Sequence, residues 1–258
     1  MEPESETGTG LPDPAARVLP LIDLTSLGDD DTDDRIVKLC NDATTDYGAV
    51  AAVCVWPRFV RLAVSVLDGA PVGIAAVANF PDGSVDPDRA VDDATSIVAA
   101  GGTEVDVVYP WRALAGGDET IGPELVAATR SAVGSDIALK VILETGELGE
   151  ERLIRQAATH AIDAGADFLK TSTGKTAHAA TPEAARFLLE TVRDSGRPIG
   201  VKIAGGIRTV AVAADYLTLA DEIMGPDWVG PGTFRFGASG LLGDVLGTAG
   251  AAGGSDGY

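Results

Sequence analysis

Short apolar runs rich in β-branched residues alternate along this chain with longer segments in which apolar positions recur every three or four residues. The first pattern predicts strands and the second predicts helices. We expect eight strands, at residues 18–23, 50–55, 73–77, 104–108, 138–143, 168–171, 200–204 and 235–237. A helix is expected after each strand, at residues 31–43, 57–67, 87–100, 123–133, 150–164, 181–195, 209–224 and 241–248. Eight alternating units favour a (β/α)8 TIM barrel over an open doubly wound sheet.

The two ends of the chain differ in composition from these units. Residues 1–18 are rich in Glu, Gly, Thr and Pro, and they lack the basic and then apolar stretches of a signal peptide. We expect a flexible leader there and a mobile Gly/Ala-rich tail over residues 249–258. No linker-like stretch interrupts residues 19–248, so a single domain of that span is predicted, in a cytoplasmic protein.

Lysine is scarce in this sequence, and three of its five lysines interrupt apolar runs that predict strands. These are Lys140, Lys170 and Lys202, whereas arginine occurs fourteen times. Lysine is rarely buried without a partner, because removing an ammonium group from water costs several kcal/mol unless it loses its proton or meets an opposite charge. We therefore expect the chain to use these amines chemically.

The barrel predicts where these lysines would meet. Chemistry in such barrels lies at the carboxyl ends of the strands, and residues two apart on a strand share a face. If the polar members point inward, the three lysines meet up to three carboxylates in one barrel mouth. Those carboxylates are Glu104, Asp106 and Glu144.

Two neighbouring lysines suffice for catalysis through a Schiff base. A neutral amine attacks a carbonyl to give a carbinolamine and then a protonated Schiff base, which withdraws electrons. The pKa of that amine must fall from about 10.4 to roughly 7–8. A second ammonium about 5 Å away contributes roughly 3 kcal/mol to this shift, and desolvation supplies the remainder. The alternative is a charge-balanced network that only props the barrel, above all for Lys140, Glu104 and Glu144.

Three glycine-containing turns follow consecutive strands and predict an anion site. Gly205-Gly206-Ile207-Arg208 leads from a strand into a helix, where backbone N–H groups and the helix N-terminus face the barrel mouth. Gly237-Ala238-Ser239-Gly240 has the same place after the last strand, where such barrels often hold phosphate. Gly174-Lys175 adds a cation one strand earlier. The three turns together favour a phosphorylated small-molecule substrate.

Several other classes of function are disfavoured. Gly174-Lys175-Thr176 copies the end of a nucleotide-binding P-loop, but Leu169 stands where that motif needs its first glycine. No dinucleotide-type glycine fingerprint is present, and His160 and His178 are too few for a typical metal-dependent aldolase. A net charge of −20 argues against broad binding of nucleic-acid phosphates, and no apolar run is long enough to span a membrane.

Two compositional features concern the environment of the protein. The excess of acid with little lysine is similar to the composition of proteins from high-salt cytoplasms, which we treat as a hypothesis. Cys40 and Cys54 are isolated in the sequence and are expected to be buried and reduced.

Six runs of the sequence resemble the deoxyribose-phosphate aldolase family. They are 21–25 (LIDLT), 79–83 (NFPDG), 104–110 (EVDVVYP), 140–148 (KVILETGEL), 165–175 (GADFLKTSTGK) and 235–239 (RFGAS). The resemblance covers the chain from about residue 20 to 245. It implies a TIM barrel and a class I aldolase without metal or cofactor. The implied reaction is the reversible cleavage of 2-deoxy-D-ribose 5-phosphate to acetaldehyde and D-glyceraldehyde 3-phosphate, commonly in a homodimer.

The resemblance also implies roles for individual residues. Lys170 would form the Schiff base, Lys202 would lower its pKa, and Asp106 would donate and accept protons. Asp23 and Thr25 would support that acid–base relay. The residues implied in binding the phosphate are Gly174, Lys175, Gly205, Gly206, Arg208, Gly237 and Ser239.

Two further candidates and two departures from the family pattern bear on the site. Lys140 and the C-terminal Tyr258 are candidates to reach the active site. Gly240 stands where close relatives often carry serine, which would remove one side-chain contact to phosphate. Ile203 follows Lys202 where relatives often show proline or another small residue, which would alter the path of the loop slightly.

Two alternative functions stay open. Another Schiff-base lyase could act on a different sugar phosphate or on a keto acid with the same barrel. A degenerate barrel could instead sense sugar phosphates without turnover. The intact set of Lys170, Lys202 and Asp106 weighs against a sensor, because a binding protein has no need of paired ammonium groups.

Overall fold

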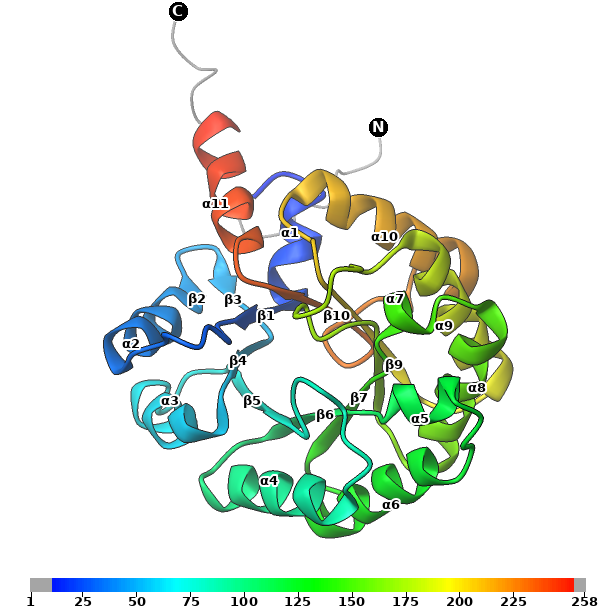
Figure 1. Ribbon diagram of the computed structural model, residues 1–258. Helices are drawn as coiled ribbons and strands as arrows, with labels where there is room; N and C mark the ends of the chain where they lie inside the picture. Colours follow the sequence, from blue (N-terminus) through cyan, green and yellow to red (C-terminus); the bar gives the residue numbers. More distant parts are fainter. Residues whose placement is uncertain (1–10, 253–258) are drawn as a thin grey trace, which may run out of the picture.

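The structure of the chain, a computed structural model, describes residues 11–252. Within that range eight parallel strands close into a barrel, in the order β1-β10-β9-β8-β7-β6-β5-β4 (Figure 1). Their bounds are β1 Ile22–Thr25, β4 Ala52–Val55, β5 Gly73–Ala78, β6 Glu104–Val108, β7 Ala138–Ile142, β8 Phe168–Lys170, β9 Gly200–Ala204 and β10 Phe234–Ala238. The predicted (β/α)8 barrel is confirmed.

Helices cover the outside of the barrel and alternate with its strands (Figure 1). Each predicted helix has a counterpart: α2 Asp33–Asp42, α3 Val60–Val66, α4 Pro87–Ala99, α6 Ile121–Val133, α8 Glu151–Asp163, α9 Pro182–Ser195, α10 Val210–Met224 and α11 Leu241–Ala252. No helix in residues 11–252 is long and apolar enough to cross a membrane.

Side-chain caps explain where four of these helices begin. The side chains of Thr32, Asp86, Thr181 and Thr209 each accept a hydrogen bond from the backbone N–H three residues further on. Such a cap satisfies an N–H group that has no partner inside the helix. The cap at Thr209 places the N-terminus of α10 directly after the glycine turn that follows β9.

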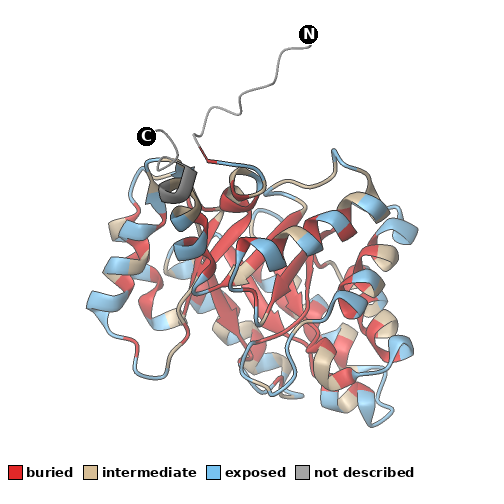
Figure 2. Cartoon of the chain, turned by 90° about the horizontal axis from the view of Figure 1, so that it is seen from above, coloured by how far each residue is buried: buried red, intermediate tan, exposed pale blue. Residues whose placement is uncertain are grey.

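The strands are buried on both faces, whereas the helices bury only the face that packs on the barrel (Figure 2). Every residue of β4, β6 and β9 is buried. Parallel strands with this pattern require both sides of the sheet to be covered. Apolar residues fill the layer between barrel and helices, and charged residues on the strands can be buried only by meeting one another inside.

The chain around the first strand differs from the prediction. β1 begins at Ile22, later than expected, because the preceding residues form α1 Ala15–Val18 and the 3-10 helix η1 Leu19–Leu21. Pro20 lies in the first turn of η1, where its missing N–H costs no hydrogen bond. Both ends of α1 are buried, so ordered packing begins inside the segment that the sequence indicated as a flexible leader.

Several short elements have no counterpart in the prediction. They are the hairpin of β2 Thr44–Thr45 and β3 Gly48–Ala49, and the helices α5 Trp111–Ala115 and α7 Thr145–Leu148. Each is too short to show a hydrophobic period. The expected helix at 57–67 divides into the 3-10 helix η2 Pro57–Phe59 and α3, and α11 extends past residue 248 into the predicted tail. Tyr258 lies outside the described residues.

Candidate active site

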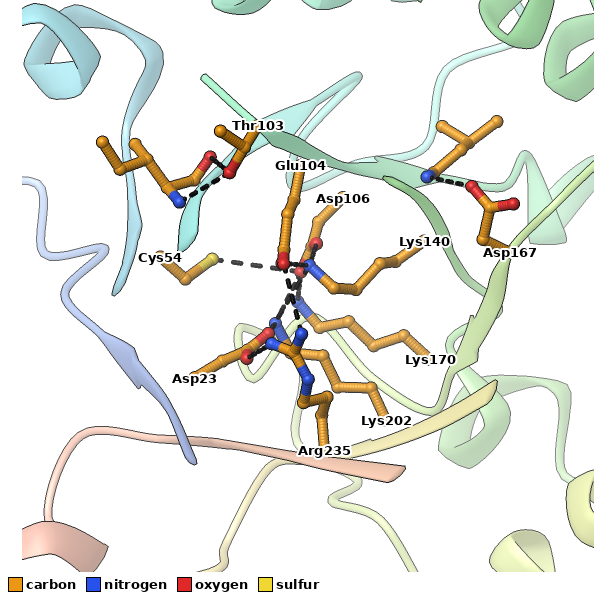
Figure 3. A network of polar contacts seen from close by, with 12 residues as sticks. Asp23, Cys54, Thr103, Glu104, Asp106, Lys140, Asp167, Lys170, Lys202 and Arg235 are labelled. Atoms are coloured by element: carbon orange, nitrogen blue, oxygen red, sulfur yellow. Dashed lines mark hydrogen bonds and ion pairs between the residues drawn. The ribbon is translucent and has the colours of Figure 1, made fainter. Parts of the chain in front are cut away.

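Seven charged side chains of the described range point toward one another inside the barrel (Figure 3). Each is buried, and six strands contribute them. They are Asp23 on β1, Glu104 and Asp106 on β6, Lys140 on β7, Lys170 on β8, Lys202 on β9 and Arg235 on β10, and we call them the charge cluster. In the strand register Asp106 pairs with Lys140, and Lys202 pairs with Lys170. The three lysines that the sequence placed in the barrel therefore do meet.

Asp106 lies at the centre of the charge cluster. Its Oδ1 accepts a hydrogen bond from Lys140 Nζ at 2.9 Å, and its Oδ2 accepts one from Lys170 Nζ at 2.7 Å and one from Lys202 Nζ at 2.8 Å. The thiol of Cys54, which is buried and free, lies 3.9 Å from the same Oδ2. The amines of Lys170 and Lys202 are therefore held on one oxygen atom.

Asp23 holds the other side of the charge cluster. Its Oδ2 lies 2.6 Å from Lys202 Nζ and 3.5 Å from Lys140 Nζ. Its Oδ1 accepts a hydrogen bond from Arg235 Nη1 at 2.6 Å. Lys202 is thus placed between two carboxylates, those of Asp23 and Asp106.

Arg235 and Glu104 complete the charge cluster near the amino ends of their strands. Arg235 Nη2 donates to Glu104 Oε1 at 3.3 Å, and the other carboxyl oxygen of Glu104 accepts a hydrogen bond from Lys140. The sequence analysis missed Arg235 as a site residue. A signal was present, because Arg235 stands between Phe234 and Phe236 and interrupts an apolar run as the three lysines do.

The lysines of the charge cluster differ in how readily they lose a proton. Burial lowers the pKa of Lys170 below the ordinary 10.5, and the Lys202 ammonium lowers it further, while Asp106 only partly offsets both. Burial acts in the same direction on Lys202 and Lys140, but the carboxylates around each of them outweigh it and raise the pKa above 10.5. Lys170 is therefore the amine best able to be neutral.

The two aspartates of the charge cluster remain ionised. Burial alone would raise the pKa of Asp106 and of Asp23, but the surrounding ammonium groups hold both below the ordinary 3.8. Because a carboxylate in this state is an acceptor only, Asp106 holds the protonated amine of Lys202 beside Lys170.

A cavity of about 390 Å³ opens at the carboxyl ends of β1, β8, β9 and β10. Lys170 is the charge-cluster residue that lines this cavity. Thr25, which is not part of the charge cluster, also lines it. The residues predicted to bind phosphate all line this cavity, and we call them the rim: Gly174, Lys175, Gly205, Gly206, Arg208, Gly237 and Ser239. The structure thus brings the candidate nucleophile and the three glycine turns around one space.

Backbone geometry explains three glycines of the rim. Gly205 and Gly206 have φ angles of 96° and 85°, which residues with a side chain rarely adopt. A Cβ atom at Gly237 would lie 3.0 Å from Cε of Lys202. Glycine at these positions therefore shapes the turn after β9 and leaves room for the Lys202 side chain.

Lys175 supplies the rim with a cation that is not firmly paired. Its Nζ lies 3.7 Å from Oδ1 of Asp29, whose side chain is 94% exposed, and 5.9 Å from the centroid of the Trp56 ring. An ion pair this long and this exposed contributes little. The ammonium of Lys175 is therefore free to turn toward an anion in the cavity.

In the described part of the chain, two predicted residues, Glu144 and Thr25, lie beside the charge cluster without an ion pair to it. Glu144 follows the end of β7 with a φ of 54°, so the alternation of faces no longer applies to it. Its carboxylate accepts hydrogen bonds from Thr173 and Thr176, and it acts on Lys170 through its charge without an ion-pair contact among the described residues. The hydroxyl of Thr25 donates to the backbone oxygen of Asp23 at 2.8 Å, so Thr25 lines the cavity without bonding to Asp106.

A second cavity of about 710 Å³ lies outside the barrel, between α2, the β2–β3 hairpin and α11. None of the seven charge-cluster residues lines it, as far as the described part of the chain shows. In residues 11–252 no group of three or more His, Cys, Asp or Glu side chains is placed to hold a metal ion.

Known proteins resemble this chain along most of its length. Residues 17–239 match the model of the DeoC/LacD family aldolases. A "putative deoxyribose-phosphate aldolase" from Coccidioides immitis is 32% identical, with a TM-score of 0.81 over 92% of this chain and 87% of that one. A protein of the same description from Toxoplasma gondii ME49 is 27% identical, with a TM-score of 0.83 over 94% of this chain and 95% of that one. The chain therefore belongs to the DeoC/LacD family of aldolases.

Proposed function

We propose that this aldolase works through a Schiff base on Lys170 and reversibly cleaves 2-deoxy-D-ribose 5-phosphate to acetaldehyde and D-glyceraldehyde 3-phosphate. One observation carries the proposal. Lys170 is the cation of the charge cluster that lines the cavity, and it is also the one whose pKa is lowered. A neutral amine facing a substrate-sized space is what attack on an aldehyde requires.

The first step forms the Schiff base. The neutral Nζ of Lys170 attacks C1 of the open-chain sugar and gives a carbinolamine. The hydroxyl group then leaves as water, which requires a proton. A proton from solvent reaches that hydroxyl by way of the hydrogen-bonded Asp106–Lys202 pair, because Oδ2 of Asp106 contacts both lysines. The product is an iminium ion on Lys170.

The second step breaks the bond between C2 and C3 of the sugar. The C3 hydroxyl gives its proton to the Asp106–Lys202 pair and becomes the aldehyde of glyceraldehyde 3-phosphate, while the electron pair of the broken bond forms an enamine with the iminium nitrogen. Protonation at C2 and hydrolysis then release acetaldehyde and restore the amine. The Asp106–Lys202 pair is the proton-carrying unit next to that nitrogen, which supports its role in these transfers.

The rim supports a phosphorylated substrate over an unphosphorylated one. Backbone N–H groups of the glycine turns and the N-terminus of α10 favour an anion by their partial charges. Lys175 adds a full charge that only a long, exposed ion pair occupies. These groups stand at the opening of the cavity, whereas Lys170 stands at its buried end, as a sugar with an aldehyde at one end and a phosphate at the other requires.

Two measurements on the purified enzyme test the proposal. Incubation with 2-deoxy-D-ribose 5-phosphate should yield acetaldehyde and glyceraldehyde 3-phosphate. Reduction with borohydride in the presence of acetaldehyde should leave an ethyl group on Lys170, located by mass mapping of peptides. Lys38→Ala is the matched control, because it removes an exposed lysine paired with Asp42 and should be labelled like the wild type.

Each contrary result has a distinct meaning. A label on Lys202 or Lys140 would show that the wrong lysine was chosen, and the absence of any label would reject the Schiff base. Cleavage of another sugar phosphate or a keto acid in place of 2-deoxyribose 5-phosphate would identify a different lyase. Binding of the phosphosugar without products would identify a sensor.

A further inference from the structure

The charge cluster contains four cationic side chains and three carboxylates. The cations are Lys140, Lys170, Lys202 and Arg235, and the carboxylates are those of Asp23, Glu104 and Asp106. If every group is ionised, the charge cluster has one positive charge in excess. Within these seven groups the excess disappears when one cation gives up its proton, while the buried carboxylate of Glu144, outside these ion pairs, adds negative charge near Lys170 in every variant considered below.

Contacts decide which cation that is. Arginine does not deprotonate in proteins. Lys140 is in ion-pair contact with three carboxylates and Lys202 with two, whereas the one carboxylate in ion-pair contact with Lys170, among the described residues, is Asp106. Lys170 therefore loses least by becoming neutral, and the lowered pKa of Lys170 agrees with this count.

We propose that Arg235 is a positioning residue that keeps Lys170 neutral by supplying the charge that makes the amine of Lys170 the surplus one. Arg235 is not among the described residues that line the cavity. Its influence on Lys170 is transmitted by other members of the charge cluster. Its guanidinium occupies Oδ1 of Asp23 and one oxygen of Glu104, which leaves less of their negative charge unpaired. The proposal rests on the proposed function, since it assumes that Lys170 is the reacting amine.

Removal of Arg235 reverses this balance. Lys140, Lys170 and Lys202 would then face three carboxylates, and each ammonium would be needed. Lys140 and Lys202 would then pair more closely with Asp23 and Glu104. Less of the negative charge of Asp106 would be compensated by them, so the ammonium form of Lys170 would be stabilised. Neutralising Glu104 has the opposite effect, because it increases the positive excess. Since neither Arg235 nor Glu104 lines the cavity, both changes act through charge and not through contact with substrate.

Other ionisable groups around Lys170 do not change with these variants. Cys54 on β4 faces the same oxygen of Asp106, and burial raises the pKa of its thiol. Glu144 after β7 is held by Thr173 and Thr176. Both groups are the same in every variant, so they set the starting pKa of Lys170 and not the direction in which it moves.

The test follows the rate at which cyanoborohydride traps acetaldehyde on Lys170 as pH is raised, with the labelled peptide quantified by mass spectrometry. In the wild type the rate should rise through an inflection below 10.5. In Arg235→Met this inflection should move up by about one pH unit or more, because a unit charge within about 12 Å shifts a pKa by at least that much at an effective dielectric constant of about 20. In Glu104→Gln it should move down. Arg235→Lys should stay near the wild type, and the double variant Arg235→Met/Glu104→Gln should return toward it.

The opposite signs separate this role from a merely structural one. Damage to the barrel would lower trapping in both single variants without moving their inflections in opposite directions. Unchanged inflections, or shifts of the same sign, would overturn the proposal. If Arg235→Met does not fold, the downward shift in Glu104→Gln and its reversal in the double variant decide the matter. A wild-type enzyme with no label on Lys170 would instead refute the proposed function.

Discussion

The charge cluster and the rim meet at Lys170 and are built from different parts of the chain. The charge cluster consists of buried side chains on strands, held by ion pairs, two or three for each member except Lys170, which has one. The rim consists of turns after strands and carries two cations, Arg208 and the loosely paired Lys175. Charges act strongly where water is excluded and weakly where it is not. The charge cluster is therefore suited to set the chemistry of Lys170, and the rim to hold the part of the substrate that does not react.

The largest effect is expected where both regions meet. Lys170→Leu should lower kcat on the order of 10⁴-fold or more, because no other amine of the charge cluster lines the described cavity. Steady-state kinetics checks this, and binding of glyceraldehyde 3-phosphate should survive because the rim is unchanged. Turnover within about tenfold of the wild type would refute the role of this amine.

A smaller effect is expected inside the charge cluster. Lys202→Met should lower kcat by about 10²–10³-fold, because a proton carrier next to the reacting nitrogen is lost. The Lys202→Met change should also move the inflection of the pH–rate profile to higher pH. Activity appears as pH rises through the lowered pKa of Lys170, and removing a neighbouring ammonium raises that pKa. A pH–rate profile measures both, and an unmoved or lowered inflection would contradict the account.

A change in the rim should leave the chemistry alone. Lys175→Ala should raise KM for the phosphorylated sugar about tenfold or more while kcat changes little, because a charge-assisted hydrogen bond to phosphate is lost. Kinetics with 2-deoxyribose lacking phosphate is the control and should hardly respond. A fall in kcat without a change in KM would show that the division between rim and charge cluster is wrong.

The smallest effect is expected from salt. Salt screens the exposed charges of the surface but hardly affects the buried charges of the charge cluster. With a net charge of −20, raising salt from about 0.1 to about 1 M should raise Tm by a few degrees through weaker repulsion on the surface. The pH inflection that belongs to Lys170 should stay in place. A Tm that is indifferent to salt would reject the high-salt hypothesis for this composition.

Alternation along the strands was enough to predict much of the site. It placed Lys140, Lys170 and Lys202 inside the barrel, and β6 has the predicted bounds because its five residues alternate between two buried layers. The pattern failed where a strand ends. Glu144 lies beyond β7 in a left-handed conformation, and no period extends across such a residue.

Other parts of the site depend on contacts that no local pattern reveals. Asp23 and Arg235 are 212 positions apart and meet only because β1 and β10 close the barrel. The apolar residues before Ile22 suggested a strand, but they form α1 and η1 because this end of the chain packs against α10 and α11. Closure of the barrel, rather than propensity, therefore determines the final composition of the charge cluster.

The central claim is that two adjacent lysines on one carboxylate have pKa values on opposite sides of the ordinary 10.5. The pKa of Lys170 lies below it and that of Lys202 lies above it. Selective ¹³C labelling of lysine gives five Cε signals in this chain, and variants assign them. Titration of these signals should show Lys170 losing its proton below 10.5, while Lys202 and Lys140 remain charged above that pH. A Lys170 signal that titrates at or above 10.5, or a Lys202 signal that titrates below it, would contradict the account.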